Sequence, residues 1–76
     1  MLYLKLEKIL YDRHMNPNQL AKLTDIRYPT ILDMVANKSK AWSPENLNKI
    51  MVALELNDPA ELIEYVKDEH KNSPEN

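Results

Sequence analysis

The sequence predicts a small all-α domain built from five helices, and three observations support that prediction. Four of the five prolines stand where a helical pattern begins, and proline is tolerated in the first turn of a helix: Pro17, Pro29, Pro44 and Pro59. After each of these prolines, apolar residues recur at helical spacing. The chain has 76 residues, which is enough for one modest core. We therefore expect one folded domain over residues 1–69, followed by a polar, disordered tail over residues 70–76.

The first residues fit two patterns. Alternating leucines predict a strand, whereas a stripe at helical spacing predicts a helix: Leu2, Leu4 and Leu6 for the strand, and Leu2, Leu6, Ile9 and Leu10 for the helix. From Lys5 onward the helix is favoured. It should end near His14, in the left-handed backbone conformation that ends many helices, and Met15 should then pack inward.

Residues 16 to 38 predict two short helices joined by a tight turn. Asn16 can cap the first helix, and Gln19 can reach back to complete a capping box. Ala21 is small enough to let the two helices cross closely. Asp25 suits a left-handed turn position better than most residues other than glycine. The inward-facing residues should be Leu20, Ala21 and Leu23 in the first helix, Ile26 in the turn, and Ile31, Met34 and Val35 in the second helix.

The second helix of this pair should open at Tyr28–Pro29 and close at Asn37, which stands in for glycine. A polar loop follows, and Trp42 should cover the edge of the core. The segment Ser43-Pro44-Glu45 starts a central helix whose apolar stripe is Leu47, Ile50, Met51 and Leu54. The segment Asp58-Pro59, with Glu61, starts a last helix that should run to about Glu69 and face inward with Leu62, Ile63 and Val66.

Charge is distributed unevenly along the chain, whose formal net charge is −2. Residues 1–42 carry seven Lys and Arg against four Asp and Glu, a balance of +3, whereas residues 43–76 carry three against eight, a balance of −5. Such asymmetry can orient a small protein on a polyanion, although ordinary solvated faces would give the same pattern.

Composition excludes several kinds of site. The absence of cysteine excludes disulfides and thiolate zinc sites, and the absence of glycine excludes phosphate-cradling glycine loops. The histidines, His14 and His70, fall at a helix end and in the tail, with no nucleophile placed beside a base. No stretch is long and apolar enough to span a membrane. We therefore expect a cytoplasmic protein that is not an enzyme and has no cofactor, no metal and no membrane partner.

The stretch from Asn16 to Lys38, with its run Ile-Arg-Tyr-Pro-Thr, resembles the helix-turn-helix of Cro and phage-repressor proteins, the XRE-like family. The resemblance covers roughly residues 4 to 68. It implies a lambda-repressor-like fold and a DNA-binding transcriptional regulator of the bacterial or phage type. Two positions depart from the family pattern: Asp25 replaces the usual turn glycine, and Pro17 replaces the usual opening glutamine. The second departure puts one phosphate contact of the family in doubt.

The resemblance also implies which residues touch DNA. Phosphate contacts fall on Asn18, Gln19, Arg27, Lys38 and Lys40. Base readout falls on Tyr28, Pro29, Thr30, Leu32 and Asp33, with Thr30 at the rim. This set lacks the Arg, Gln or Asn that usually reads guanine or adenine, so readout would use thymine methyl groups and a cytosine amino group bound by Asp33.

The function predicted is that of a repressor which binds an operator with an inverted repeat as a homodimer, placing residues 29–36 in the major groove of double-stranded DNA. Pairing would use either the Leu2–Leu4 segment or the last helix with Tyr65. The alternative is a protein-interaction module on the same fold, such as an antirepressor or an antitoxin-like protein with a regulatory protein partner. In that case the exposed Tyr28 and Leu32 would meet a protein, and Asp33 would be an ordinary solvated residue.

Overall fold

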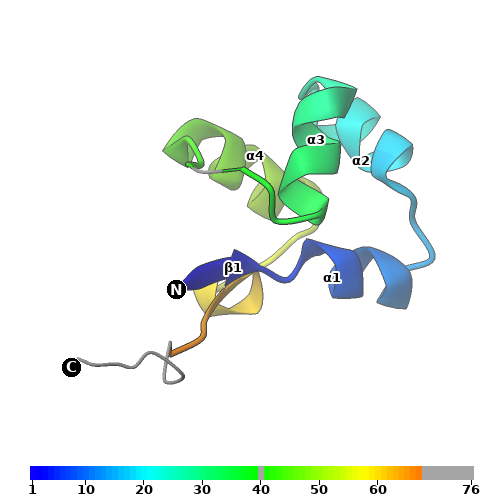
Figure 1. The fold of residues 1–76 in the computed structure, drawn as a ribbon. Helices are drawn as coiled ribbons and strands as arrows, with labels where there is room; N and C mark the ends of the chain where they lie inside the picture. Colours follow the sequence, from blue (N-terminus) through cyan, green and yellow to red (C-terminus); the bar gives the residue numbers. More distant parts are fainter. Residues whose placement is uncertain (40, 68–76) are drawn as a thin grey trace.

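The computed structural model describes residues 1–39 and 41–67, which form four α-helices, one 3-10 helix and a two-stranded sheet (Figure 1). In chain order the elements are β1 (Leu2–Leu4), α1 (Leu6–Asp12), α2 (Pro17–Thr24), α3 (Tyr28–Val35), α4 (Pro44–Ala53), the 3-10 helix η1 (Pro59–Glu61) and β2 (Ile63–Tyr65). In Figure 1, helices α2, α3 and α4 gather on one side of the molecule, and β1 and α1 run along the other.

The core lies between these two groups of elements. The buried apolar residues come from every element except η1 and β2, and from the segments that join them: Leu4, Leu6, Leu10, Leu20, Ala21, Ile26, Ile31, Met34, Ile50, Leu54 and Leu62. Half-buried residues complete this core, and they include Met15, Val35, Trp42, Leu47 and Met51, as expected from the sequence. Trp42 therefore covers the edge of the core.

The prediction of five helices was wrong at the C-terminal end of the described chain. Asp58 and Glu61 do form the expected capping box, but the helix that it opens is the three-residue η1. Ile63 to Tyr65 then extend as β2 and pair antiparallel with β1, with Leu4 opposite Ile63 and Leu2 opposite Tyr65. The physical reason is that β1 offers backbone hydrogen bonds to a segment whose β-branched and aromatic residues fit a strand. Val66, expected to face inward, is exposed, and the predicted helix end at Glu69 lies outside the described residues, as does the tail.

The two patterns at the N-terminus are both present, one after the other. Residues 2 to 4 follow the strand pattern, and the helical pattern holds from Leu6 onward. Lys5 separates them: its N–H donates to the Leu62 carbonyl at 2.8 Å, as in a strand, and its carbonyl accepts from the Ile9 N–H at 3.0 Å, as in a helix. The β pairing therefore ends and the helix begins at this one residue.

Leu23 was wrongly expected to face inward. Its side chain is 61% exposed, and the buried residues of α2 are Leu20, Ala21 and Thr24. The burial of Thr24 was not predicted, because the expected core was chosen from apolar residues at helical spacing and threonine is polar. Its hydroxyl is satisfied within the helix, since it donates to the Leu20 carbonyl at 2.8 Å.

All four α-helices end at a residue with a left-handed backbone, in a chain without glycine: His14, Asp25, Asn37 and Glu55. The first three were expected from the sequence. At the ends of α1, α3 and α4, an N–H bonds to the carbonyl five residues earlier, and the donors are Met15, Lys38 and Leu56. These are Schellman ends, which satisfy carbonyls that the helix itself cannot pair.

Asn37 has a second structural role, because its side chain joins the end of α3 to β1. The Asn37 Oδ1 accepts from the Leu4 N–H at 2.8 Å, and the Asn37 Nδ2 donates to the Leu4 carbonyl at 3.0 Å. One amide group therefore pairs Leu4 as a neighbouring strand would.

Candidate nucleic-acid interface

Helices α2 and α3 form the predicted helix-turn-helix. At the start of α2, Asn16 and Gln19 make the capping box: the Asn16 Oδ1 accepts from the Gln19 N–H at 2.8 Å, and the Gln19 Oε1 accepts from the Asn16 N–H at 2.9 Å. The cap fixes where α2 begins and therefore where Asn18 and Gln19 stand.

The turn between the two helices is held by three neighbouring residues. Asp25 takes the left-handed conformation with φ of 59°, which reverses the chain direction without a glycine. Ile26 is buried as a plug, and its N–H donates to the Thr24 Oγ1 at 3.3 Å. The orientation of α3 relative to α2 is therefore set by backbone conformation, a buried side chain and a buried hydrogen bond.

Helix α3 buries one side and exposes the other. Ile31 and Met34 are almost wholly buried, and they anchor the helix to the core. The exposed residues recur one and four positions apart and so share a single outward face: Tyr28, Pro29, Leu32, Asp33 and Ala36. Four of these five are the residues assigned to base readout from the sequence, and Thr30 is half-buried beside them.

Ala36 was missed among the candidate readout residues. It is exposed and stands four residues after Leu32, so it continues the same face at the end of α3. The spacing alone could have identified it, but a small apolar residue gave no chemical signal.

The candidate phosphate-binding residues lie at the ends of the two helices. Asn18 and Gln19 are exposed in the first turn of α2, Arg27 is exposed immediately before α3, and Lys38 is exposed after it. Lys40 lies outside the described residues. The Gln19 N–H is already used by Asn16, so of these two residues only Asn18 keeps a backbone N–H that could meet a phosphate, and Gln19 would contribute its side-chain amide.

Arg27 and Lys38, the two described cations at the ends of α3, have no counter-ion among the described residues. Among residues 1–39 and 41–67, ion pairs join Lys8 to Asp12 at 3.0 Å and Lys49 to Glu45 at 3.7 Å, both outside the motif. Neither Arg27 nor Lys38 forms an ion pair with a described residue, so each can meet an external anion without first breaking a pair. The Asp33 carboxylate likewise has no ion-pair partner in the described part of the chain.

The other residues considered for catalysis or metal binding either have a structural role or lie outside the described chain. His14 ends α1 with a left-handed backbone, and Glu61 caps η1, whereas His70 lies outside the described residues. In the part of the chain that the structure describes, no three His, Asp or Glu side chains converge as a metal site would require. None of the described helices has the length and apolar character needed to cross a bilayer.

Comparison with known proteins agrees with this geometry. A family model described as a Cro/C1-type helix-turn-helix DNA-binding domain matches residues 5–68, which include the four α-helices, η1 and β2 but not β1. No curated protein and no solved structure matches the chain. Because the matched residues cover most of the chain and contain α2, the turn and α3, the chain belongs to the Cro/C1-type helix-turn-helix DNA-binding domains.

Proposed function

We propose that this protein is a transcriptional repressor that binds operator DNA as a homodimer, with α3 in the major groove. The observation that carries the proposal is the division of α3 into a buried side, anchored by Ile31 and Met34, and a continuous exposed side. A helix held rigidly in this way can present its outer side chains to base edges with little loss of conformational freedom. A repressor of this kind would act in the cytoplasm.

Phosphates on either side of the groove would be bound at the two ends of the motif. The Asn18 N–H in the first turn of α2 suits a phosphate because helix N-termini carry partial positive charge. Gln19 would add its side-chain amide. Arg27, Lys38 and Lys40 would supply the cations, and these contacts would fix the register without reading sequence.

Base readout would be mainly apolar. Tyr28 and Leu32 are 45% and 40% exposed and could contact thymine methyl groups, and Asp33 could accept from a cytosine amino group. Pro29 and Ala36 lie on the same face and would allow close approach, with Thr30 at its rim. We expect an operator in which thymine and cytosine contacts set the preference.

Pairing of two copies would use the sheet. The two surfaces suggested by the sequence, around Leu2–Leu4 and around Tyr65, are the two strands of this sheet. On β2, the backbone groups of Ile63 and Tyr65 point away from β1, because the pairs Leu2–Tyr65 and Leu4–Ile63 are the positions that do not exchange hydrogen bonds. Antiparallel pairing of β2 with β2 of a second copy would make a continuous sheet across a two-fold axis and require an inverted repeat in the operator.

The phosphate assignment is tested on an operator selected from a library of random duplexes. Replacing Arg27, Lys38 and Lys40 together by Ala should weaken binding on all sequences, and each lost contact should lower the slope of log affinity against log salt by roughly one. The matched control replaces Lys8, Lys49 and Lys67, which lie outside the motif, and should leave most of the slope unchanged. Equal slopes for the two triple variants would refute the assignment.

The readout assignment is tested by single substitutions on α3. Leu32→Ala and Asp33→Ala should each cost about 1–3 kcal/mol on the selected operator and much less on random DNA. Repeating the selection with each variant should change the preference at one or two base pairs. Equal losses on both DNAs would contradict a role in readout.

The exposure of Tyr28 and Leu32 also fits the alternative, in which α3 meets a regulatory protein. Sedimentation with and without the selected operator separates the two. The repressor proposal expects two copies per operator. Failure to select any duplex, or one copy bound per duplex, would favour the protein-interaction module.

A further inference from the structure

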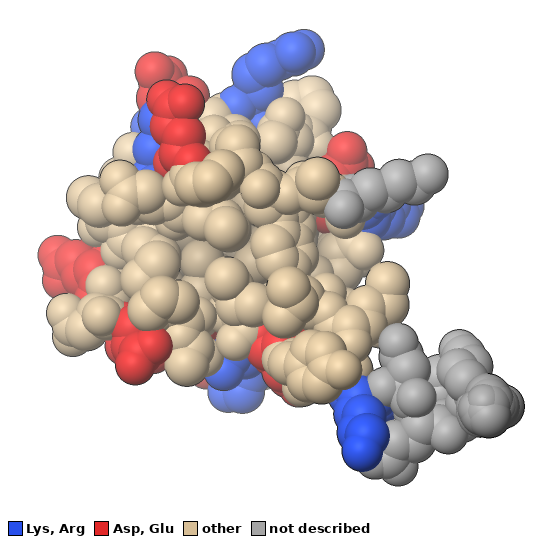
Figure 2. All heavy atoms as spheres, turned by 90° about the vertical axis from the view of Figure 1, so that its left-hand side faces the viewer, with Lys and Arg blue, Asp and Glu red and all other residues tan. Residues whose placement is uncertain are grey.

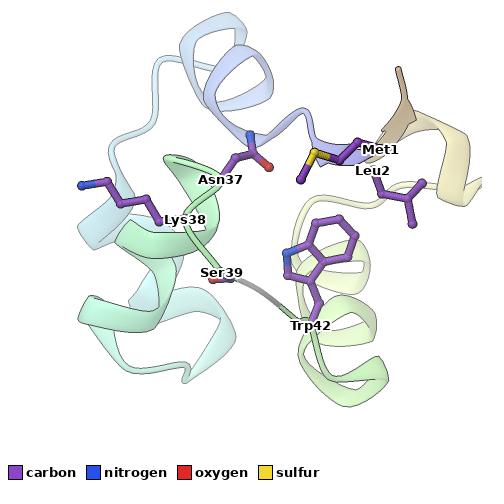
Figure 3. Close-up of a pocket in the computed structure, with 6 residues that line it drawn as sticks. All are labelled: Met1, Leu2, Asn37, Lys38, Ser39 and Trp42. Atoms are coloured by element: carbon purple, nitrogen blue, oxygen red, sulfur yellow. The ribbon is translucent and has the colours of Figure 1, made fainter. Parts of the chain in front are cut away.

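A pocket of about 490 Å³ opens beside β1, on the side away from β2 (Figure 3). Its walls come from the start of the chain, from the turn after α3 and from the loop before α4: Met1, Leu2, Asn37, Lys38, Ser39 and Trp42. Figure 3 shows the Trp42 ring between the N-terminal residues and that turn, and it shows the Lys38 ammonium pointing away from the ring. The pocket is thus lined by three apolar residues, Met1, Leu2 and Trp42, and by three polar ones from the turn after α3, of which Lys38 directs its ammonium away from the indole.

One wall of the pocket is the edge of β1 that faces away from β2, where the backbone groups of Leu2 are unpaired within the described part of the chain. The Met1 carbonyl accepts from the Val66 N–H at 2.8 Å, and the Lys5 N–H donates to the Leu62 carbonyl at 2.8 Å, so the odd-numbered residues of this segment pair with the β2 side. Because backbone groups alternate along a strand, those of Leu2 and Leu4 point the other way. Leu4 is paired there by the Asn37 amide, whereas the Leu2 N–H and carbonyl have no partner among the described residues.

The Asn37 amide marks the line that a third strand would follow. It donates to Leu4 and accepts from it, as a peptide group of a neighbouring strand does. The next free position along that line is Leu2, which lines the pocket. An extended backbone placed there would satisfy the Leu2 N–H and carbonyl, and one of its side chains would enter the pocket against Trp42.

The surrounding surface favours an apolar occupant. Figure 2 views the side on which the N-terminus lies in Figure 1, and the centre of that face shows no Lys, Arg, Asp or Glu side chain among the described residues; these lie around its margin. Leu2 itself is 54% exposed. A charged side chain would find no Lys, Arg, Asp or Glu side chain of the described residues at the centre of this face, whereas an apolar side chain would bury surface against Leu2 and the indole.

We propose that the free edge of β1 binds a short extended segment of a partner protein, which pairs with Leu2 and places an apolar side chain in the pocket beside Trp42. A second copy of this chain fits less well. Two β1 strands paired about Leu2 would exchange hydrogen bonds at that residue alone, because the Asn37 amide of each copy already occupies Leu4. A short peptide segment needs to pair only with Leu2, which is the free position of the β1 edge.

The test uses the full chain labelled with ¹⁵N and a panel of capped peptides, acetyl-Thr-Val-X-Val-Thr-amide, in which X is Ala, Leu, Met or Phe. At millimolar concentration the peptides with a large X should shift the NMR signals of the Leu2 amide and the Trp42 indole, and the Ala peptide should bind more weakly. N-methylation of the same peptides at X removes the central donor of one backbone edge, and N-methylation at both valines removes the two flanking donors of the other edge. One of the two methylated forms should lose binding.

Leu2→Pro provides the matched change in the protein. It removes the N–H that points into the pocket and does not change Tyr3, which pairs with Glu64 of β2, since proline is tolerated at the first residue of an edge strand. It should weaken peptide binding about fivefold to tenfold, the equivalent of one hydrogen bond, whereas Leu2→Val should retain it. Retained signals of the Tyr3 and Val66 amides would verify that the sheet is still formed.

Three results would overturn the proposal. The first is the absence of any shift with the whole panel. The second is equal binding by both methylated forms, which would mean that no backbone pairing occurs. The third is a shift of the Leu2 and Trp42 signals on raising the protein concentration alone, which would assign the edge to a second copy.

Discussion

The helix-turn-helix and the two-stranded sheet are stabilised by contacts of different range. In the motif, the hydrogen bonds that set the cap and the turn join residues at most four positions apart: Asn16 with Gln19, Thr24 with Leu20, and Ile26 with Thr24. In the sheet, every pair joins the start of the chain to its far end, such as Leu2 with Tyr65. The motif can therefore form from local contacts, whereas the sheet forms only after the two distant ends of the described chain have come together.

Asn37 belongs to both regions. Its left-handed backbone ends α3 locally, and its side-chain amide pairs Leu4 of β1 at long range. The end of α3, the helix proposed to read DNA, is therefore hydrogen-bonded to the sheet through one side chain, in addition to the apolar core that Ile31 and Met34 share with Leu4. Substitutions in each region, and at Asn37 itself, measure how strongly the two regions are coupled.

The largest expected effect comes from removing one buried leucine in each region. Leu20 of α2 and Leu62, just before β2, are both fully buried. Leu20→Ala and Leu62→Ala should each lower the free energy of unfolding by about 3 kcal/mol, from lost burial and the cavity left behind. Chemical denaturation followed by circular dichroism and by fluorescence of Trp42 should give one midpoint for both signals. If the sheet were a separate unit, Leu62→Ala would leave the helical transition where it was.

A smaller effect is expected from cutting the link itself. Asn37→Ala removes both hydrogen bonds to Leu4 and places a less suitable residue in a left-handed conformation, and should cost about 2–3 kcal/mol in the free energy of unfolding. Asn37→Gly keeps the helix end and removes only the link, so it should cost about 1 kcal/mol less than Asn37→Ala. Hydrogen exchange of the Leu4 amide should accelerate in both variants. An unchanged exchange rate would mean that Asn37 does not hold β1.

The smallest effect should be a gain. Glu55 ends α4 with φ of 56°, is exposed, and makes no side-chain hydrogen bond with the described residues. Glu55→Gly should therefore raise the free energy of unfolding by about 0.5–1 kcal/mol, because glycine adopts this conformation without steric cost. Thermal unfolding measures the change, with Glu55→Ala as the control that should give no gain. Stabilisation by Ala as well would place the effect in the charge of Glu55 and not in its backbone.

The difference in contact range also explains which parts of the site could be predicted. The cap at Asn16, the turn at Asp25 and the outward positions of Tyr28, Leu32 and Asp33 follow from local chemistry and helical spacing, and the structure has them as expected. The Gln19 N–H is used by Asn16 and is not open to a phosphate, which the same capping box could have indicated. Whether these residues bind DNA as assigned stays a prediction.

Sequence alone determined the all-helical centre of the chain, because caps, prolines and apolar periodicity act over a few residues and agree with one another. Only the tertiary structure decided the two ends. Residues 63 to 65 carry an apolar pattern that suits a helix or a strand, and the choice depended on β1, whose backbone groups would otherwise have remained unpaired. The same long-range closure gave Asn37 a partner in Leu4 and left Leu2 at a free edge, and no local pattern could have predicted either.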